Sequence, residues 1–504
     1  MADVILTGLA ANDPVPGNYV EINFAQGESS NGQGIYGTLM MGNKTSAGSA
    51  TVDTVVYGPT SATQLQTEAD AIALFGTGSE LHTMIADFMK VNPDTPVYAI
   101  AVTESGGTAA SRDHVVATTA TANGNIRFYF GDEFVDTAVA SGDTAGTICT
   151  NIVASINSKT KWQVTAAVVT TTTVRVTARH KGPRGNWLRT MVVLQGSFST
   201  TVSNSASGFL ASGATADDNT AALATIAGTR YYYTVSAAED ATQLGALATQ
   251  TNANAAPTVG ICSRVFAGSN DTSGNAITVA TGINGARVEI GWLAQSDVPP
   301  HRIAARFAAV YSKWEAGAIP RCNFSGFGNA DNESADWRVR APLSGAVPTR
   351  ATIKSLLQNG VTPIGCNANG STYIVKRITT RCLNGSNPDF RIRDGHKVTV
   401  MDRLADDWKA KCAAQYTGKK IGDDPAPGAR TPGAEVVTPR VVKAGMTKLL
   451  RDYEGNDLLE NVDATIDGMN VSRSSSPTTR MGVRVKVDVI DILDQVSSAF
   501  DQVG

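Results

Sequence analysis

The feature that most constrains the fold is a helical pattern followed at once by a buried-strand pattern. Residues 79–90 place four apolar side chains on one face of a helix: Leu81, Ile85, Phe88 and Met89. The pair Asn92-Pro93 ends this helix, and residues 96–102 then form an unbroken apolar run that indicates a buried strand. Elements that alternate in this way are typical of a sheet covered by helices, so we expect an α/β core.

The same alternation returns after residue 216, with a stretch of different character in between. Helices are predicted at 217–226, 240–249 and 302–311, and strands at 230–235 and 257–262. Residues 112–210 instead carry β patterns at 125–130, 162–169 and 174–178, with one helix at 144–157. Polar linkers at 105–108 and 212–215 flank this stretch, which favours a β-rich domain inserted into the α/β core.

The length of 504 residues suggests about three domains. We predict a mixed α/β (α+β) multidomain chain, in which the C-terminal α+β domain has a strand at 373–379, a helix at 402–416 and a loop at 423–433. The expected divisions are an N-terminal arm (1–26), the core in two parts (27–104 and 216–368), the inserted outer domain (105–215) and the C-terminal domain with its terminal strand arm (369–504).

The chain shows no arrangement of residues that points to catalysis. Its five histidines form no H-E-x-x-H pair, no G-x-S-x-G elbow or P-loop is present, and six cysteines form no C-x-x-C pair. Three carboxylate pairs have structural interpretations: Asp217/Asp218 at a helix start, Asp406/Asp407 on a solvated helix face, and Asp423/Asp424 in a turn. We therefore expect no enzyme, no metal, no cofactor and reduced thiols.

One motif leaves an enzymatic alternative open. Residues 32–37 fit G-x-G-x-x-G, which binds a dinucleotide when the glycines follow a buried strand and open a helix. Here a polar loop precedes the glycines, and the short apolar run 38–42 that follows them predicts a strand. Turns are the favoured role of these glycines, with an NAD-binding enzyme as the alternative.

Charge and hydropathy limit the partners. A formal net charge of −3 argues against a dedicated nucleic-acid binder. No stretch approaches the ~20 apolar residues of a membrane span, so we expect no direct membrane insertion. The first residues show no basic segment and no long apolar run, and we expect folding in the cytosol. A β-rich surface or adhesin protein is a second alternative, although it would need an export signal.

Both ends of the chain carry alternating strands. Residues 18–24 place Val20, Ile22 and Phe24 on one face. Residues 481–489 do the same with four valines: Val483, Val485, Val487 and Val489. These segments are either ordinary strands of their own sheet or arms that complete the sheets of neighbouring subunits.

Several segments, taken in order, resemble contractile tail sheath proteins of Mu-like phages, which are related to the sheaths of R-type bacteriocins and other contractile injection systems. Residues 14–22 resemble the sheath N-terminal arm, and residues 37–44 the first core strand with its glycine turn. Residues 123–130 and 177–186 resemble the inserted domain, and residues 373–381 with Pro388-Asp389 the C-terminal core.

The resemblance implies a structural function. Sheath subunits form stacked six-membered rings around a tail tube, in a metastable extended state, and contract to drive the tube through the target envelope. The implied partners are other copies of the chain, the tube protein, and baseplate and tail terminator proteins. The implied location is the virion tail, assembled in the host bacterial cytoplasm. The C-terminal domain would face the tube, with Lys409 and Lys411 as candidate tube contacts, and the inserted domain would point outward.

Overall fold

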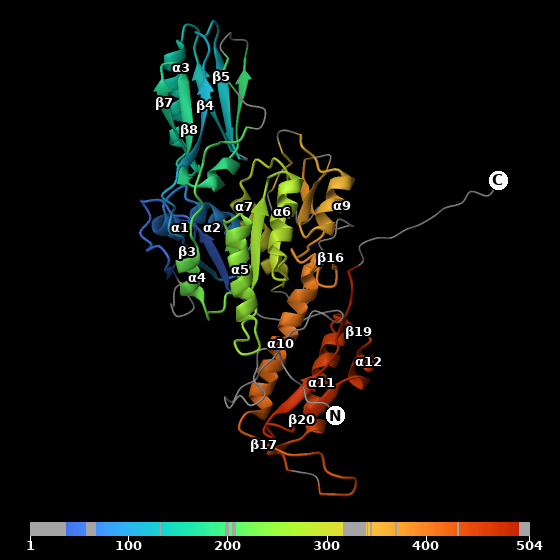
Figure 1. Cartoon of the computed structure of the whole chain (residues 1–504). Coiled ribbons are helices and arrows are strands. Elements are labelled where there is room, and N and C mark those ends of the chain that lie inside the picture. Colours follow the sequence, from blue (N-terminus) through green and yellow to red (C-terminus); the bar gives the residue numbers. More distant parts are fainter. Residues whose placement is uncertain are drawn as a thin grey trace, which may run out of the picture.

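Three units follow one another along the molecule (Figure 1). The computed structural model describes residues 37–56, 67–131, 133–196, 201–203, 208–315, 339, 341–342, 345–367, 370–430 and 433–492. Within these residues a β-rich unit lies at one end, a helix-covered sheet in the middle and a smaller helical and β unit at the other end (Figure 1). The predicted class, a mixed α/β and multidomain chain, is confirmed.

The central unit is built on an eight-stranded sheet with the order β14-β13-β12-β11-β10-β1-β3-β2. Pairing is parallel from β13 to β3 and antiparallel at both edges, where β14 and β2 lie. The strands are β1 (Thr38–Gly42), β2 (Val55–Val56), β3 (Val97–Ala101), β10 (Tyr233–Ser236), β11 (Arg264–Ser269), β12 (Val288–Trp292), β13 (Thr362–Cys366) and β14 (Thr372–Ile374).

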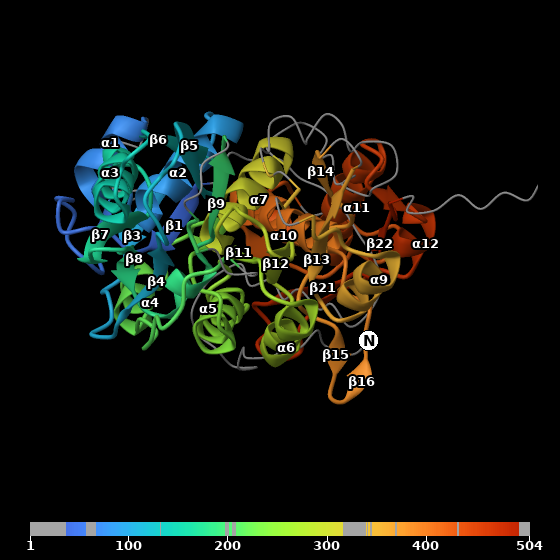
Figure 2. The ribbon, with the colours of Figure 1, turned by 90° about the horizontal axis from the view of Figure 1, so that it is seen from above.

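Helices cover both faces of this sheet (Figure 2). One face carries α1 (Glu68–Phe75), α2 (Glu80–Val91) and α7 (Pro300–Glu315), and the other carries α4 (Thr220–Ile226), α5 (Ala241–Asn254), α6 (Ser273–Ile283) and α9 (Arg350–Gln358). Successive strand residues point to opposite faces, so Met40 enters the core under α2 and α7, whereas Leu39 and Met41 enter the other core. All five residues of β1 are buried, as expected for a strand covered on both sides.

The inserted unit has its own apolar core. It contains β4 (Ala109–Val115), β5 (Gly124–Phe130), β6 (Glu133–Val139), α3 (Ala145–Ser158), β7 (Val164–Thr170), β8 (Thr173–Lys181), the 3₁₀ helix η1 (Pro183–Trp187) and β9 (Thr190–Gln195). The strands form two three-stranded sheets, β4-β8-β7 and β6-β5-β9. Their apolar side chains and those of α3 form one cluster that draws only on residues between 110 and 210.

A long helix, α10 (Gly395–Tyr416), connects the central unit to the third unit and runs from the central sheet to the far end of the molecule (Figure 1). The hairpin of β15 (Leu383–Asn384) and β16 (Asn387–Pro388) precedes this helix and lies beside the end of α6, where Asn284 bonds to Leu383. Around α10 lie β17 (Lys420–Ile421), β18 (Val436–Val437), α11 (Pro439–Glu454), β19 (Leu459–Glu460), α12 (Val462–Asp467), β20 (Asn470–Arg473), β21 (Met481–Arg484) and β22 (Asp488–Val489).

The structure corrects three predicted elements. The strand expected at 257–262 is a turn, with Gly260 at φ +66°, and the strand that follows is β11 instead. The strand expected at 373–379 ends at Ile374. The helix expected from 402 begins at Gly395. Since β14 pairs with β13, the predicted division at 368/369 cuts the central sheet, and α10 is where the third unit begins.

Charged and polar contacts join the inserted unit to the core. Arg184, on η1, pairs with Glu80 at 3.1 Å and with Asp217. Asp217 was predicted only as a helix-start residue, whereas its side chain is 2% exposed and binds this arginine. Burial alone would raise the pKa of Glu80, but Arg184, together with His180, His301 and the Asn43 amide, outweighs burial and lowers the pKa. Gln163 adds a 2.6 Å hydrogen bond to His301 on α7.

The two ends of the inserted unit lie side by side, because Thr108 forms a β-bridge with Ala214. Together with the separate apolar cluster, this neighbourhood leads us to propose residues 105–215 as a separable insertion.

Excision tests the insertion. Replacing residues 109–213 with a short Gly/Ser linker should leave a folded remainder of lower stability, because Glu80 and Asp217 lose the arginine that pairs with them. The same excision with Glu80→Gln and Asp217→Asn should recover most of that loss in denaturant unfolding. A remainder that lacks cooperative unfolding in both forms would contradict the proposed boundaries.

Candidate functional site at the C-terminal sheets and their joint

The C-terminal unit is a thin assembly of two small sheets on one helix. The hairpin β20–β21 and the pair β19–β22 both pack against α11, and their side chains share one apolar cluster with Val400 and Leu404 of α10. Among the described residues each of these sheets has only two strands. Two-stranded sheets have unpaired backbone groups on both outer edges, so each can accept a further strand.

The terminal valines lie on one face, as the alternation predicts, but that face packs on their own chain. Val487 and Val489 are 5% and 0% exposed, and Val483 and Val485 pack against the same cluster. The single strand expected at 481–489 is two strands: β21 pairs with β20, with Val483 opposite Val471, and β22 pairs with β19. The segment therefore completes its own subunit's sheets first.

The N-terminal strand residues of the prediction, Val20, Ile22 and Phe24, lie outside the described residues. Whether either terminal segment also pairs with a neighbour stays a prediction.

The two lysines expected to touch a tube are not on the exposed face of α10. Lys409 donates from Nζ to the backbone oxygen of Gly260 at 2.6 Å, which ties it to the central unit. Lys411 is partly buried. This burial, together with a smaller effect of the nearby positive charge on Lys448, lowers the pKa of Lys411. Their role as tube contacts stays a prediction, and the hydrogen bond of Lys409 makes Lys411 the better candidate.

Ion pairs fix the upper half of α10 to the central sheet. Arg287 pairs with Asp402 through both carboxylate oxygens, and Arg230 pairs with Asp406. Asp407 accepts a hydrogen bond from the Tyr453 hydroxyl of α11 at 2.6 Å. The predicted solvated face at Asp406/Asp407 is thus a contact surface, because its partners come from segments far away in the sequence.

A buried ionic cluster lies where α10 begins. It unites Arg264 of β11, Glu289 of β12, Glu315 at the end of α7 and Arg377, whose side chains are 0–3% exposed. Arg377 lies 2.8 Å from Glu289 and also pairs with Glu315, while Arg264 pairs with Glu289 and lies 3.2 Å from Glu315. Thr399 of α10 donates to Glu315 at 3.0 Å.

The charges of this cluster balance. Burial alone would raise the pKa of Glu315, but Arg377 and then Arg264 outweigh it and lower the pKa to about 2. Glu315 is therefore ionised at neutral pH, and two cations face two anions. No sequence signal marked these residues as a cluster, since they come from four segments that lie far apart in the chain.

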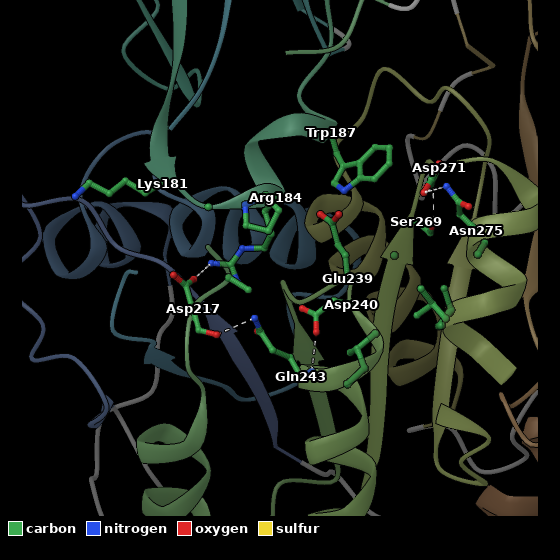
Figure 3. Close-up of a pocket in the computed structure, with 18 residues that line it drawn as sticks. Lys181, Arg184, Trp187, Asp217, Glu239, Asp240, Gln243, Ser269, Asp271 and Asn275 are labelled. Atoms are coloured by element: carbon green, nitrogen blue, oxygen red, sulfur yellow. Dashed lines mark hydrogen bonds and ion pairs between the residues drawn. The ribbon is translucent and has the colours of Figure 1, made fainter. Parts of the chain in front are cut away.

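A pocket of about 250 Å³ lies at the carboxyl ends of β10 and β11, below the inserted unit (Figure 3). Open parallel sheets often hold ligands at this edge, so the pocket is where a dinucleotide would be expected. Four carboxylates line it: Asp217, Glu239, Asp240 and Asp271. Asp240 already caps the start of α5, the position that a pyrophosphate would take.

The chemistry of this pocket therefore opposes a pyrophosphate, and Gly37 leads into strand β1 rather than into a helix. The remaining glycines of 32–37 lie outside the described residues. In the described part of the chain, no three His, Cys, Asp or Glu side chains are grouped to hold a metal ion. The helices described there are all too short or too polar to cross a bilayer.

No family model matches the chain. Over 173 residues, 34% of its length, it is 29% identical to the Mu-like prophage FluMu tail sheath protein of Haemophilus influenzae. The chain is similar to a phage tail sheath protein. The predicted resemblance is confirmed, and the match spans about a third of the length of this curated relative.

Solved structures of sheath proteins are also similar. The sheath tail protein of Desulfitobacterium hafniense is 13% identical, with 94% of this chain and 100% of that one covered and a TM-score of 0.45. The sheath complex of an extracellular contractile injection system in its contracted state is 10% identical, with 97% and 98% covered and a TM-score of 0.44.

The valine face can be tested in the isolated subunit. Val489→Ala should lower the free energy of unfolding by roughly 2 kcal/mol because it opens a cavity in the subunit's own core. Val485→Ala, a matched change at a partly buried position, should cost less than about 1 kcal/mol. Equal stability of the two variants and the parent in denaturant unfolding would mean that the face packs only on neighbours.

The start of α10 should make the fold sensitive to acid. His396 is 5% exposed, and burial, reinforced by Lys397 and Lys376, lowers its pKa to about 4, although Asp394 and Asp491 act in the other direction. As the pH falls below about 6.5, His396 is protonated in the unfolded chain but stays neutral in the folded chain. The contribution of neutral His396 to the free energy of unfolding is therefore complete above pH 6.5 and is lost progressively down to about pH 4.

Between pH 7.5 and 5 this histidine alone should cost about 2 kcal/mol. In the variant His396→Gln the loss of unfolding free energy over that interval should be smaller by this amount. Identical pH profiles for the parent and the variant would show that His396 titrates normally.

Proposed function

We propose that this chain is the structural subunit of a contractile tail sheath. The observation that carries the proposal is the 173-residue match to a Mu-like prophage tail sheath protein. The chemistry of the described residues agrees with a structural function, because the buried charged side chains at the start of α10 are engaged in ion pairs within the chain.

The proposed assembly is a stack of six-membered rings around a tail tube. The two-stranded sheets of the C-terminal unit supply the connections: a terminal segment of a neighbouring subunit adds a strand to an open edge. An added strand with ~4–6 ladder bonds at ~1 kcal/mol each gives a contact of several kcal/mol before its ordering cost. Val20, Ile22 and Phe24 are the candidates for the N-terminal arm.

A groove beside β20 supports this arrangement. The lining of this open depression of about 610 Å³ includes Asp423, Asp424, Pro439, Val471, Ser472 and Arg473. The hydroxyl of Ser472 is buried and has no hydrogen-bond partner among the described residues. A buried hydroxyl of this kind is stabilised when an added backbone segment supplies a partner.

The proposed action is a switch between two packings of the same subunits. The extended stack is metastable, a signal from the baseplate releases it, and contraction drives the tube through the target envelope. The work comes from the difference in contact free energy between the two states, so no nucleotide or cofactor is used. The arms hold the mesh together while other contacts exchange.

The proposed partners are further copies of the chain, the tail tube protein, and baseplate and tail terminator proteins. The proposed location is the virion tail, with assembly in the host bacterial cytoplasm. The inserted unit would point outward, because it lies at the end of the molecule opposite the C-terminal unit (Figure 1).

Electron microscopy of the purified protein tests the assembly. At high concentration the parent chain should form rings or tubes without any added cofactor. A strictly monomeric species in analytical ultracentrifugation, with the fold intact, would contradict the proposal. Tubes that require NAD would revive the enzymatic alternative.

Two deletions test the arms. Removing residues 1–24, or residues 493–504, leaves β22 and the valine core in place, so each variant should melt like the parent and fail to form tubes. Val168→Thr, at an exposed position of the inserted unit, is a matched surface control and should assemble normally. Normal tubes from both deletions would rule out strand exchange through the termini.

A further inference from the structure

The pocket between the inserted unit and the core contains a carboxyl group that forms no ion pair with any described residue. Glu239 follows β10, and its carboxyl group points toward the ring of Trp187 on η1 (Figure 3). Its Oε1 atom is buried and accepts no hydrogen bond from the described residues. An unpaired carboxyl oxygen in such a place is costly, so it marks a site where a partner would be stabilised.

Two cationic side chains line the pocket, and neither is available to Glu239. The guanidinium of Arg184 binds Glu80 and Asp217, and the side chain of Lys181 points away from Glu239 (Figure 3). Burial raises the pKa of Glu239 well above its usual value; Arg184 lowers it, but Glu80, Asp240 and Asp271 raise it further. The pocket therefore holds an excess of acid groups over available cations.

The walls suit an organic cation rather than a bare ion. Leu244, Val279 and Ile290 contribute apolar surface to the lining, and Trp187 contributes an aromatic ring. An apolar wall accepts an alkyl stem, and the face of an indole attracts a positively charged head group. The volume of about 250 Å³ is of the order needed for one side chain.

We propose that this pocket binds one guanidinium or alkylammonium group, with the carboxylate of Glu239 as its counterion and Trp187 beside it. On binding, the proton of Glu239 leaves to solvent, and the carboxylate and the cation form the ion pair. Because Trp187 belongs to the inserted unit and Glu239 to the core, the bound cation would hold the two units together.

The group has two sources with the same chemistry: a free small cation, or an Arg or Lys side chain of a second copy of this chain. The first requires only the isolated subunit. The second also requires assembly, but the pocket itself does not depend on the proposed sheath function.

Calorimetric titration of the isolated subunit with ethylguanidinium chloride tests the free cation, with sodium chloride at equal ionic strength as the blank. We expect saturable binding that releases about one proton per site, measured in buffers of different ionisation enthalpy. Glu239→Gln should weaken binding at least tenfold and release no proton, while its melting temperature stays at or above that of the parent. Val279→Trp, which fills the pocket from α6, should also weaken binding.

A second arm distinguishes the sources. If ethylguanidinium does not bind, but both variants lose an assembly that the parent forms, the cation is a side chain of another copy. Equal affinity of the parent and Glu239→Gln for ethylguanidinium overturns the proposal. Absence of binding also overturns it, unless both variants lose an assembly that the parent makes.

Discussion

The buried cluster of Arg264, Glu289, Glu315 and Arg377 is the constraint on which the arrangement of the units depends. Four charges with almost no exposure are tolerated only while all of them are paired, and removing one partner typically costs about 3–5 kcal/mol. The four residues belong to β11, β12, the end of α7 and the segment before α10. Gly395 begins α10 directly on the cluster, where a Cβ atom would lie 2.9 Å from Arg377 and Glu289. The cluster therefore fixes both the sheet and the origin of the long helix.

Much of the fold could be predicted where apolar side chains repeat with a clear period. The helix α2 lies within one residue of the predicted range 79–90, and β5, β7, β8 and α3 lie where their patterns indicated. Prediction failed where charge is buried. β11 begins with Arg264, which is fully buried although an arginine normally indicates a surface position. The apolar pattern therefore predicts the strand a few residues too early, at 257–262, where the structure has a turn.

The candidate site could be predicted only in part. Alternation correctly placed four terminal valines on one face, but period 2 says nothing about whose sheet the face covers, and Val489 is buried in its own subunit. The sequence assigns Asp217 to a helix start and Asp406 to a solvated helix face, because their arginine partners lie 33 and 176 residues away. Glu239 carried no signal at all, because the residues that surround it in the pocket come from segments far apart in the sequence.

The length of α10 has a mechanical consequence. Its 22 residues correspond to roughly 33 Å at 1.5 Å per residue; ion pairs clamp one end, and the β17–β18 sheet follows the other end. A tilt of roughly 10° in the central unit would therefore sweep the β17–β18 sheet through roughly 6 Å, more than the ~4.8 Å spacing between adjacent strands. Such a rigid arm converts a small rotation of the central body into a full strand's width of travel at its tip.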